Sequence, residues 1–527
     1  MGIYLNPGVE NFRRTLASGT YVDKTMMISE INRFIDTGKN YICVSRPRRF
    51  GKTIASNMLS SYYSKGIDSR ELFSGLKIAS TPSFEEKLNK YNVIKLDLNS
   101  EYQNTEDKVN LIRIITEKVK AEMKPIFPDV VFADTDTLAE CILKVYTATG
   151  ETFIIIIDEY DVLVREQTEK ELFDKYLSFL NGLFKSDTLR PAISLAYLTG
   201  ILPVVRDKIQ SKLNNFLEYT ILNAGKLSEY MGFTSEEVKQ LCVENKVDYD
   251  TCRSWYDGYR LNEFEVYNPE SVIRCMEDGE FENYWGKTST YLAISERINM
   301  NFDGTKDAVV KMLSGECIDV NVTRYLNTMN QFSSKDDVFT YLIHLGYLAY
   351  DKHEKTCRIP NGEIRQEWFN AIEAEDEYKE TNKIIKASKE LLKSTLSGNE
   401  SAVAEALDLS HIHVTSNRSY NNEDALQSAI YLAYIYALND YFCFREMTAG
   451  KGFADVVYIP LHAEKRDKPA LIIELKRNDS AESGLEQIRQ KRYFDCLRQF
   501  EGELLLIGIN YDEKEKTHTA KIERMEK

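Results

Sequence analysis

The feature that most restricts the fold is an unbroken apolar run at residues 153–157, followed directly by Asp158 and Glu159. Such a run is typical of a strand buried on both faces of a sheet. Short apolar segments at 40–45, 93–98 and 193–199 have the same character, and helical patterns separate them. Strands that alternate with helices predict an α/β fold with a mainly parallel sheet and flanking helices.

A phosphate-binding loop is predicted between the strand at 40–45 and a helix at 54–63. Residues 46–53, RPRRFGKT, match the second half of the pattern G-x-x-x-x-G-K-[ST], and Arg46 stands where the first glycine is expected. Backbone N–H groups that converge after Gly51, at the start of a helix, bind phosphate. Lys52 would then reach the β- and γ-phosphates of ATP, and Thr53 would hold Mg²⁺.

The acidic pair after the apolar run is the expected partner of this loop. Asp158 would bind the Mg²⁺ shell at the carboxyl edge of the sheet, and Glu159 would polarise the water that attacks the γ-phosphate. The alternative is a buried strand that ends in an acidic turn. Asp161 is equally a candidate cap of the following helix. Thr199, which ends the next strand, either senses the γ-phosphate or begins a turn.

These segments resemble the AAA-ATPase-like family of uncharacterised bacterial proteins. In that family the RPRRFGK form of the loop is usual, so Arg46 counts as part of the motif. The resemblance implies a P-loop ATPase fold and no known substrate. It covers roughly residues 1–290 and rests on YVDKT at 21–25, RPRRFGKT at 46–53, DEYD at 158–161, LTGI at 198–201, LNN at 213–215, WYDGYR at 255–260 and YNP at 267–269.

The arginines of the loop carry two interpretations. Guanidinium groups at this place either neutralise phosphate charge or pair with Asp23 or other acids and brace the fold. The sequence favours bracing for Arg46 and nucleotide contact for Arg49.

A second set of polar residues lies on two predicted strands near the end of the chain, at 453–459 and 471–476. If these strands form a hairpin, Asp455 and Glu474 meet on one side. Glu474 and Lys476 share a face because side chains alternate along a strand. Two carboxylates and a lysine suit a Mg²⁺ site that activates water for attack on a phosphodiester. A surface ladder of ion pairs is the alternative.

The order of these residues resembles the PD-(D/E)xK nuclease superfamily over about residues 400–520. The resemblance implies metal binding by Glu423, Asp455 and Glu474, with Lys476 as the catalytic cation. Glu423 is alternatively an acid at a helix start. Gln487 and Tyr493, on the helix after the hairpin, either face nucleic acid or pack the helix. The departure from the family pattern is Phe453, where a basic or small residue is expected.

The net charge of −15 limits how this chain would bind nucleic acid. Phosphate contacts need Lys and Arg, so DNA or RNA would have to bind at a local basic surface. Arg489, Lys491, Arg492 and Arg498 are candidates for these contacts, and a solvated helix face is the equal alternative.

Cysteine and hydropathy patterns favour a reduced, cytoplasmic protein. The nine cysteines form no C-x-x-C pair, and only His411 and His413 of the six histidines are close together, which predicts neither a zinc site nor a disulfide framework. No apolar run approaches the ~20 residues that cross a bilayer, and the N-terminal residues lack a secretory pattern. We expect no membrane partner and leave a homo-oligomer open.

Changes of pattern divide the chain into four predicted parts. An AAA-like P-loop ATPase domain occupies 1–225, and a helical lid or middle domain occupies 226–370. A charged helical connector follows at 371–400, and a solvated helix is its default interpretation. The last part, 401–527, has the pattern helix, strand, strand, helix, strand of an α/β restriction-endonuclease-like domain.

The leading functional hypothesis is an ATP-binding and ATP-hydrolysing protein with a fused Mg²⁺-dependent nuclease that acts on DNA or RNA. The alternative is a nucleotide-dependent switch whose C-terminal domain binds nucleic acid or protein without cleavage. A small-molecule kinase is a weaker third hypothesis, because it leaves the C-terminal carboxylates unexplained.

Overall fold

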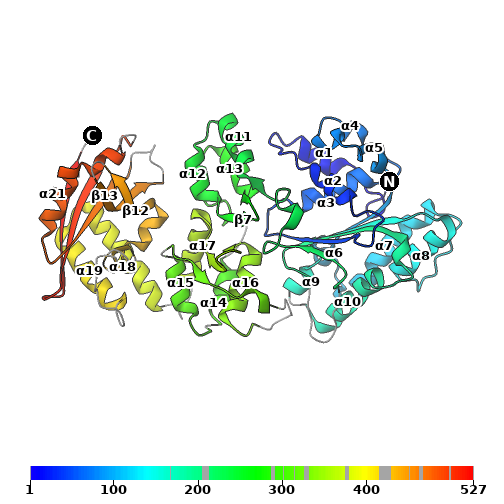
Figure 1. Ribbon diagram of the computed structural model, residues 1–527. Helices are drawn as coiled ribbons and strands as arrows, with labels where there is room; N and C mark the ends of the chain where they lie inside the picture. Colours follow the sequence, from blue (N-terminus) through cyan, green and yellow to red (C-terminus); the bar gives the residue numbers. More distant parts are fainter. Residues whose placement is uncertain are drawn as a thin grey trace. The chain divides into compact units, whose positions relative to one another are not determined.

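The computed structural model describes residues 2–166, 168–204, 213–286, 291–300, 302–313, 315–325, 332–373, 379–414, 426, 429–431, 433–449, 452–461, 467–497 and 500–525. These residues form two compact units, each made of two stretches of chain: 1–280 with 319–360, and 281–318 with 361–527. The colours of Figure 1 follow the chain through both. The four-part division at 225, 370 and 400 stays a prediction.

A five-stranded parallel sheet forms the centre of the first unit, in the order β2-β3-β4-β1-β5. The four strands expected from the sequence are present and parallel, so the predicted α/β fold is confirmed. The fifth, β5, was not expected. The bounds are β1 Tyr41–Ser45, β2 Asn92–Asp97, β3 Phe153–Asp158, β4 Ile193–Gly200 and β5 Leu217–Tyr219.

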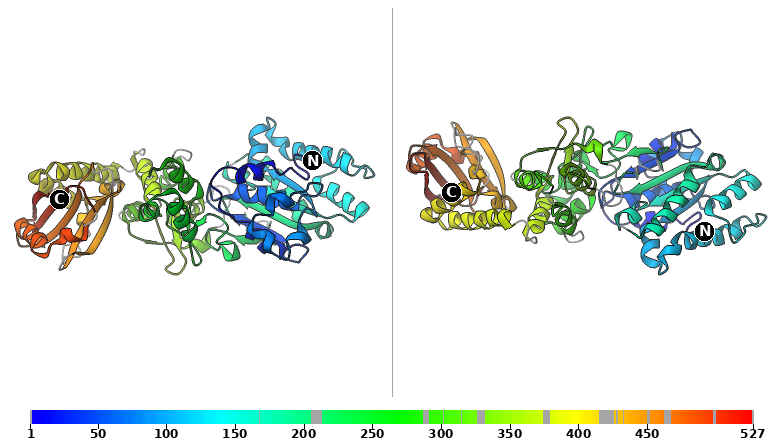
Figure 2. Two further views of the ribbon diagram at one scale, coloured as in Figure 1. Left: turned by 90° about the horizontal axis from the view of Figure 1, so that it is seen from above. Right: turned by 90° about the horizontal axis from the view of Figure 1, so that it is seen from below.

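Both faces of this sheet are buried by helices, which explains the unbroken apolar run in β3. Phe153, Ile155 and Ile157 pack into one apolar cluster, and Ile154 and Ile156 pack into the other. Figure 2 shows the first helices of the chain from above and the later ones from below. The cluster with Ile154 and Ile156 includes side chains of α1 Glu10–Leu16, α2 Met26–Asn32 and α3 Lys52–Tyr63. The other cluster includes side chains of α7 Leu111–Ile126, α8 Leu138–Thr149 and α10 Lys170–Phe184.

The rest of the first unit mixes helices with short strands. A capping box begins α11, because the Thr234 hydroxyl accepts from the Glu237 N–H and the Glu237 carboxylate accepts from the Thr234 N–H. The turn-rich aromatic segments at 255–269 contain two strands that were not expected. The elements are β6 Phe233–Thr234, α11 Ser235–Asn245, α12 Tyr249–Tyr256, β7 Tyr259–Leu261, β8 Phe264–Tyr267, α13 Pro269–Asp278, α16 Lys335–Leu345, β10 Ala349–Asp351 and β11 Thr356–Arg358.

Helices dominate the first part of the second unit. Within the predicted charged connector, residues 379–397 form a helix, α18, with one buried face that includes Ile385, Leu391 and Thr395, so this helix is not solvated all round. The Thr395 hydroxyl lies 2.7 Å from the Tyr434 hydroxyl. The helices are α14 Leu292–Ile298, α15 Thr305–Leu313, α17 Gly362–Glu373, α18 Lys379–Ser397 and α19 Glu400–Val414.

A five-stranded mixed sheet, in the order β12-β13-β14-β15-β16, completes the second unit. β13 and β14 pair antiparallel, so the predicted pairing of these strands is confirmed. β14 and β15 are parallel, and α21 connects them. The two edge strands, β12 and β16, were not expected from the sequence. The bounds are β12 Tyr441–Ala449, β13 Gly452–Pro460, β14 Ala470–Arg477, α21 Ala481–Lys491, β15 Leu504–Asp512 and β16 Thr517–Met525.

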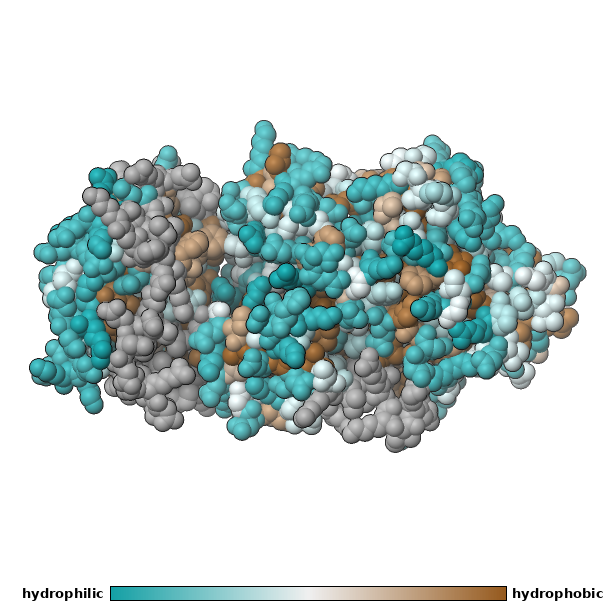
Figure 3. Space-filling view, in the orientation of Figure 1, coloured by the Kyte–Doolittle hydropathy of each residue, from teal (hydrophilic) through white to brown (hydrophobic). Residues whose placement is uncertain are grey.

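The surface carries mainly hydrophilic side chains on the face shown in Figure 3, with apolar residues scattered among them. Among the described helices, none combines the length and the apolar character that a bilayer crossing needs.

Candidate functional site

The predicted phosphate loop connects β1 to α3, and two of its residues have a left-handed backbone conformation. Arg49 has a φ of 66° and Gly51 a φ of 86°. Gly51 adopts this conformation without steric cost, whereas Arg49 pays about 1–2 kcal/mol for it. Gly51 is also the N-cap of α3 and offers no side-chain acceptor to the first N–H groups of the helix. A left-handed loop before a helix N-terminus forms a concave set of donors that suits an anion.

Lys52 lies inside this loop rather than in solvent. Its side chain is 4% exposed, its Nζ donates to the Pro47 carbonyl at 2.9 Å, and it lies 3.8 Å from Glu159 Oε1. Burial lowers the pKa of Lys52, and the carboxylates of Glu159, Asp161 and Asp158 oppose this shift. The loop therefore contains a buried ammonium group, which is a hydrogen-bond donor suited to phosphate oxygens.

Asp158 ends β3 as a buried carboxylate. Oδ1 accepts from the Glu159 N–H at 3.0 Å, and Oδ2 accepts from the Ser56 hydroxyl at 3.2 Å. Burial raises the pKa of Asp158, and a hydrogen bond from Thr53 is the largest opposing effect. Carboxylate and hydroxyl oxygens are ligands that Mg²⁺ prefers, so Asp158 and Thr53 fit a magnesium ion.

Glu159 follows with a left-handed backbone, at a φ of 52°. Oε1 faces Lys52, and Oε2 accepts a hydrogen bond from Arg165 Nη2. Burial raises the pKa of Glu159, and Lys52 and Arg165 lower it. The turn after β3 thus brings a carboxylate, Glu159, beside the cation of the loop.

Asp161 occupies the N-cap position of α9 (Val162–Arg165) but makes no side-chain cap bond, so the cap interpretation is wrong. Its Oδ2 accepts instead from the N–H groups of Ile201 at 3.0 Å and Leu202 at 2.8 Å, beyond the end of β4. Arg165 Nε donates to the same oxygen at 3.1 Å. Asp161 therefore ties the turn after β3 to the chain after β4.

Thr199 lies near the end of β4, in register with Asp158 on β3 and Val44 on β1. It is fully buried. The sheet therefore brings Thr199 to the same carboxyl edge as the acidic pair. A role for Thr199, Arg49 or Gly51 in nucleotide binding stays a prediction.

Arg46 is buried and braces the fold through backbone carbonyls. Its guanidinium donates to the carbonyls of Ser45 at 2.8 Å, Tyr219 at 2.9 Å and Leu227 at 3.5 Å. Asp23, the acid suggested from the sequence, accepts instead from Thr25 and from the Lys77 N–H. Burial lowers the pKa of Arg46 to about 10.

Two residues of this edge were missed from the sequence. Asp97 ends β2 in register with Asp158, and its negative charge contributes to the raised pKa of Asp158. Arg165 holds Glu159 and Asp161. Asp97 has a visible signal, because it ends a predicted parallel strand just as Asp158 does. Arg165 has none, because its partners are set by the turn after β3.

The second group of candidates lies on the mixed sheet of the second unit. Val456 pairs with Ile473, which places Asp455 and Glu474 on neighbouring strands one step away. Asp455 Oδ2 accepts from the Leu475 N–H at 2.7 Å, and Lys476 Nζ lies 3.0 Å from Glu474 Oε1. The structure thus brings Asp455, Glu474 and Lys476 together.

Gln487 on α21 completes a polar network with the strand residues. Its Oε1 accepts from Lys476 Nζ at 2.8 Å, and its Nε2 donates to Glu474 Oε1 and, at 3.0 Å, to the Tyr493 hydroxyl. Gln487 therefore fixes the lysine and the glutamate at once.

Glu474 is a buried carboxylate with a raised pKa. It is 3% exposed, and burial, with a contribution from Asp455, raises its pKa to about 7. Lys476 opposes the shift. Glu474 Oε2 is buried and meets no donor with hydrogen-bond geometry in the described structure, although the Asp455 backbone slightly lowers the pKa. A buried carboxylate oxygen beside a second carboxylate fits a divalent cation.

Several predicted residues lie outside this description. Glu423 and Arg498 are not among the described residues, and nothing is described of the Phe453 side chain. Of the basic candidates on α21 and after it, Arg489 pairs with Glu523, and Arg492 pairs with Asp495. The described part of the network therefore consists of Asp455, Glu474, Lys476, Gln487 and Tyr493.

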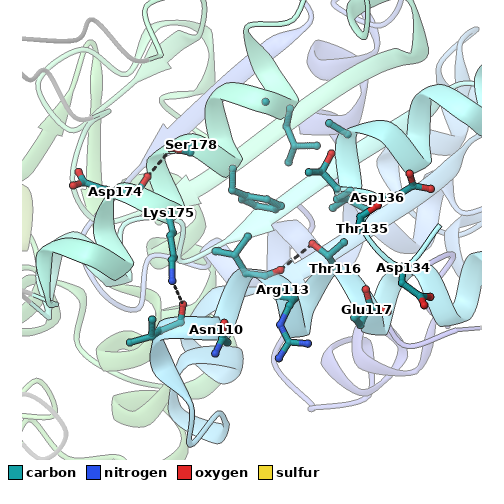
Figure 4. A pocket seen from close by; sticks show the side chains of 18 of the residues that line it. Asn110, Arg113, Thr116, Glu117, Asp134, Thr135, Asp136, Asp174, Lys175 and Ser178 are labelled. Carbon is teal, nitrogen blue, oxygen red and sulfur yellow. Dashed lines mark hydrogen bonds between the residues drawn. The ribbon is translucent and has the colours of Figure 1, made fainter. Parts of the chain in front are cut away.

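A cavity of about 830 Å³ lies within the first unit, between α7, α8 and α10. Figure 4 shows it with the labelled side chains of Arg113, Glu117 and Asp174 around it. Its floor is mainly apolar. None of the residues proposed for phosphate or metal binding lines it, so its size alone gives it no chemical role here.

Comparison with known families gives two matches. Residues 6–210 match a model described as a predicted AAA-ATPase, and residues 421–521 match the PD-(D/E)XK nuclease superfamily. The first match contains Lys52, Asp158 and Glu159, and the second contains Asp455, Glu474 and Lys476.

Individual relatives are distant. An uncharacterised protein of the vnfD 5′ region of Azotobacter chroococcum mcd 1 is 25% identical over 287 residues, 51% of each chain, so the match spans about half of that relative. A Walker-type ATPase of Pyrococcus abyssi has a TM-score of 0.35 at 11% identity, covering 66% of this chain and 94% of that one. The ORC2 protein of Aeropyrum pernix has a TM-score of 0.29 at 9% identity, covering 68% and 98%.

Proposed function

We propose that this chain, which joins an AAA-ATPase-like domain to a PD-(D/E)XK nuclease superfamily domain, hydrolyses ATP in its first unit and cleaves nucleic acid in its second. The observation that carries the proposal is the meeting of Lys52, Asp158 and Glu159 at one edge of the parallel sheet. A cation, a metal-binding carboxylate and a second carboxylate are what phosphoryl transfer to water requires.

Each residue of the first unit has a separate task in this proposal. Lys52 leaves the Pro47 carbonyl and pairs with phosphate oxygens of ATP, where it stabilises the charge that develops during transfer. Thr53 and Asp158 hold Mg²⁺, which neutralises phosphate charge when it is bound. Glu159 orients the attacking water and accepts its proton.

In the second unit, Asp455 and Glu474 hold a divalent cation through their carboxylates. Such an ion lowers the pKa of a bound water and stabilises the charge on the phosphodiester. Lys476, fixed by Gln487 and Glu474, places its ammonium group beside the phosphate that is attacked. Glu474 must lose its proton to bind the ion, so cleavage would increase as pH rises through about 7.

Phosphate release from Mg²⁺-ATP tests the first activity. We expect the full-length protein to release phosphate and Lys52→Ala to reduce the rate at least about 100-fold, because the cation acts on the developing charge. Arg113→Gln, an exposed arginine of the same unit, is the control and should leave the rate unchanged. Tight ATP binding without Lys52-dependent release would instead indicate a nucleotide-dependent switch.

Cleavage of labelled DNA and RNA tests the second activity. Glu474→Ala should abolish Mg²⁺- or Mn²⁺-dependent cleavage and leave ATP binding unchanged, because the two sites lie in separate units. Cleavage that persists in this variant would refute the site. Binding of nucleic acid without cleavage by the wild-type protein would favour the switch.

A further inference from the structure

A continuous series of hydrogen bonds connects the backbone after β4 to the Glu159 side chain. The N–H groups of Ile201 and Leu202 donate to Asp161 Oδ2, and Arg165 Nε donates to that same oxygen. The other end of the Arg165 guanidinium, Nη2, donates to Glu159 Oε2. These hydrogen bonds, through Arg165 and Asp161, therefore fix the Glu159 carboxylate relative to the backbone just beyond Thr199.

These contacts leave the Arg165 side chain little freedom to move. Its side chain is 9% exposed, and the Asp161 side chain that anchors it is fully buried. A guanidinium is planar and presents its five N–H groups in a fixed fork, so the bonds from Nε and Nη2 restrict how the two carboxylates lie relative to each other. The negative charge of Glu166 adds further electrostatic attraction to the arginine.

Glu159 needs such a restraint because it has a second cationic neighbour. Lys52 Nζ lies 3.8 Å from Oε1, whereas Arg165 donates to the other carboxylate oxygen, Oε2. Lys52 must pair with phosphate when ATP binds, so it cannot also hold Glu159 in place. Arg165 has no role at the phosphates in the proposed function and keeps its anchor on Asp161.

We propose that Arg165 is the positioning residue of the ATPase site, which holds the Glu159 carboxylate in the orientation that activates water. This inference rests on the proposed hydrolysis of ATP. It adds a residue that lies outside the phosphate loop and acts only through Glu159. A displacement of the carboxylate by about 1 Å is enough to cost about 100-fold in rate.

The opposite interpretation is that Arg165 merely holds α9 to the core. Loss of a purely structural brace would loosen the turn after β3, including Asp158, and would weaken binding of ATP together with catalysis. Loss of a positioning residue would lower kcat and leave KM for ATP nearly unchanged. The two interpretations therefore differ in a quantity that steady-state kinetics separates.

The test is Mg²⁺-dependent phosphate release by the full-length protein carrying Arg165→Gln or Arg165→Lys. We expect Arg165→Gln to lower kcat about 10- to 100-fold with KM within threefold of wild type. Arg165→Lys keeps a cation within reach of Glu159 but loses the fork, and it should restore part of the lost kcat. Arg113→Gln serves as the matched control, with wild-type kcat and KM.

Three results would overturn the inference: a kcat within threefold of wild type in Arg165→Gln, a KM that rises in step with the fall in kcat, or no restoration in Arg165→Lys. If Arg165→Gln does not fold, Arg165→Lys decides alone, and wild-type kcat in that variant refutes the positioning role. Wild-type protein without Lys52-dependent phosphate release refutes the proposed function rather than the role of Arg165.

Discussion

Two buried cations six residues apart, Arg46 and Lys52, shape the phosphate loop in different ways. Lys52 is bound to a single carbonyl of its own loop and faces carboxylates that would share the site with Mg²⁺. The terminal nitrogens of the Arg46 guanidinium donate to carbonyls from three separate segments. A cation with one replaceable partner is available to a ligand, whereas one with three fixed partners serves the fold.

Replacement of Arg46 should therefore act on stability. Arg46→Ala leaves buried carbonyls without donors, and we expect it to lower the free energy of unfolding by about 3 kcal/mol. Hydrogen exchange of peptides from β1 and β4 measures the loss. Arg48→Ala, at an exposed position of the same loop, is the matched control and should change stability by less than about 0.5 kcal/mol. Equal effects of the two substitutions would contradict this account.

His518 should make the second unit sensitive to acid. Its ring Nδ1 lies 2.8 Å from Asp408 Oδ1 on α19, and burial lowers its pKa more strongly than Asp408 raises it. The folded state thus resists protonation, while the unfolded chain binds a proton near pH 6.5. The contribution of His518 is full above that pH and is lost as the pH falls below it.

The prediction concerns the thermal midpoint of the second unit. We expect it to fall between pH 7.5 and pH 5.5 in the wild-type protein and to fall less in His518→Gln, whose side chain does not titrate. Melting curves of both proteins at the two pH values measure this difference. The same pH dependence in both proteins would show that His518 is not responsible.

The residues of the candidate sites differ in how well the sequence reveals them. Lys52 and Asp158 follow from local order along the chain, since a strand, a loop and a helix fix their place. Asp97 carries the same signal at the end of a predicted parallel strand and was overlooked. The role of Arg165 depends on the turn after β3, which no local pattern states. Asp161 was misjudged because the N–H groups that donate to its carboxylate lie about forty residues further along the chain.

At the scale of elements, the second site depends on how closely α21 packs against β15. A Cβ on Gly508 would lie 2.0 Å from the Ala481 carbonyl oxygen, and a Cβ on Gly484 would lie 3.1 Å from the Gly508 Cα. Only glycine permits this distance between helix and strand. Gln487 reaches Lys476 and Glu474 because α21 lies this near to the sheet.

Gly508→Ala should consequently damage both packing and site. We expect a loss of about 3 kcal/mol from overpacking, together with weaker protection of Gln487 and its neighbours on α21. Hydrogen exchange of α21 and β15 peptides reports both effects. Gly182→Ala in α10 is the matched control, because its Cβ would meet nothing within 4 Å, and it should be neutral or stabilising by up to about 1 kcal/mol. Unchanged exchange in Gly508→Ala would contradict the close approach.

Elements with continuous apolar character were predictable, and short or edge elements were not. β3 and β4 are buried on both faces, so nearly every residue carries the signal. β5 has three half-buried residues, and β7 and β8 lie in a stretch whose aromatic residues and turns obscure the alternation. α18 looked solvated because its charges outnumber the few apolar positions of its buried face.

At the scale of the whole molecule, the two groups of site residues lie in different compact units. The chain passes from one unit to the other at 280, 318 and 360, so the units are not simply consecutive along the sequence. Composition and periodicity do not show which stretches of the chain belong to which unit, because long-range packing decides this. The central claim is that each unit carries its own metal-dependent chemistry.

Titration of the full-length protein with Mn²⁺, a replacement for Mg²⁺, tests this claim most directly. Without nucleotide, we predict one bound ion that is lost in Glu474→Gln and kept in Asp158→Asn. A non-hydrolysable ATP analogue should add a second ion that is lost in Asp158→Asn and kept in Glu474→Gln. Ion binding that neither substitution alters, or a single ion that both substitutions remove, would contradict two independent sites.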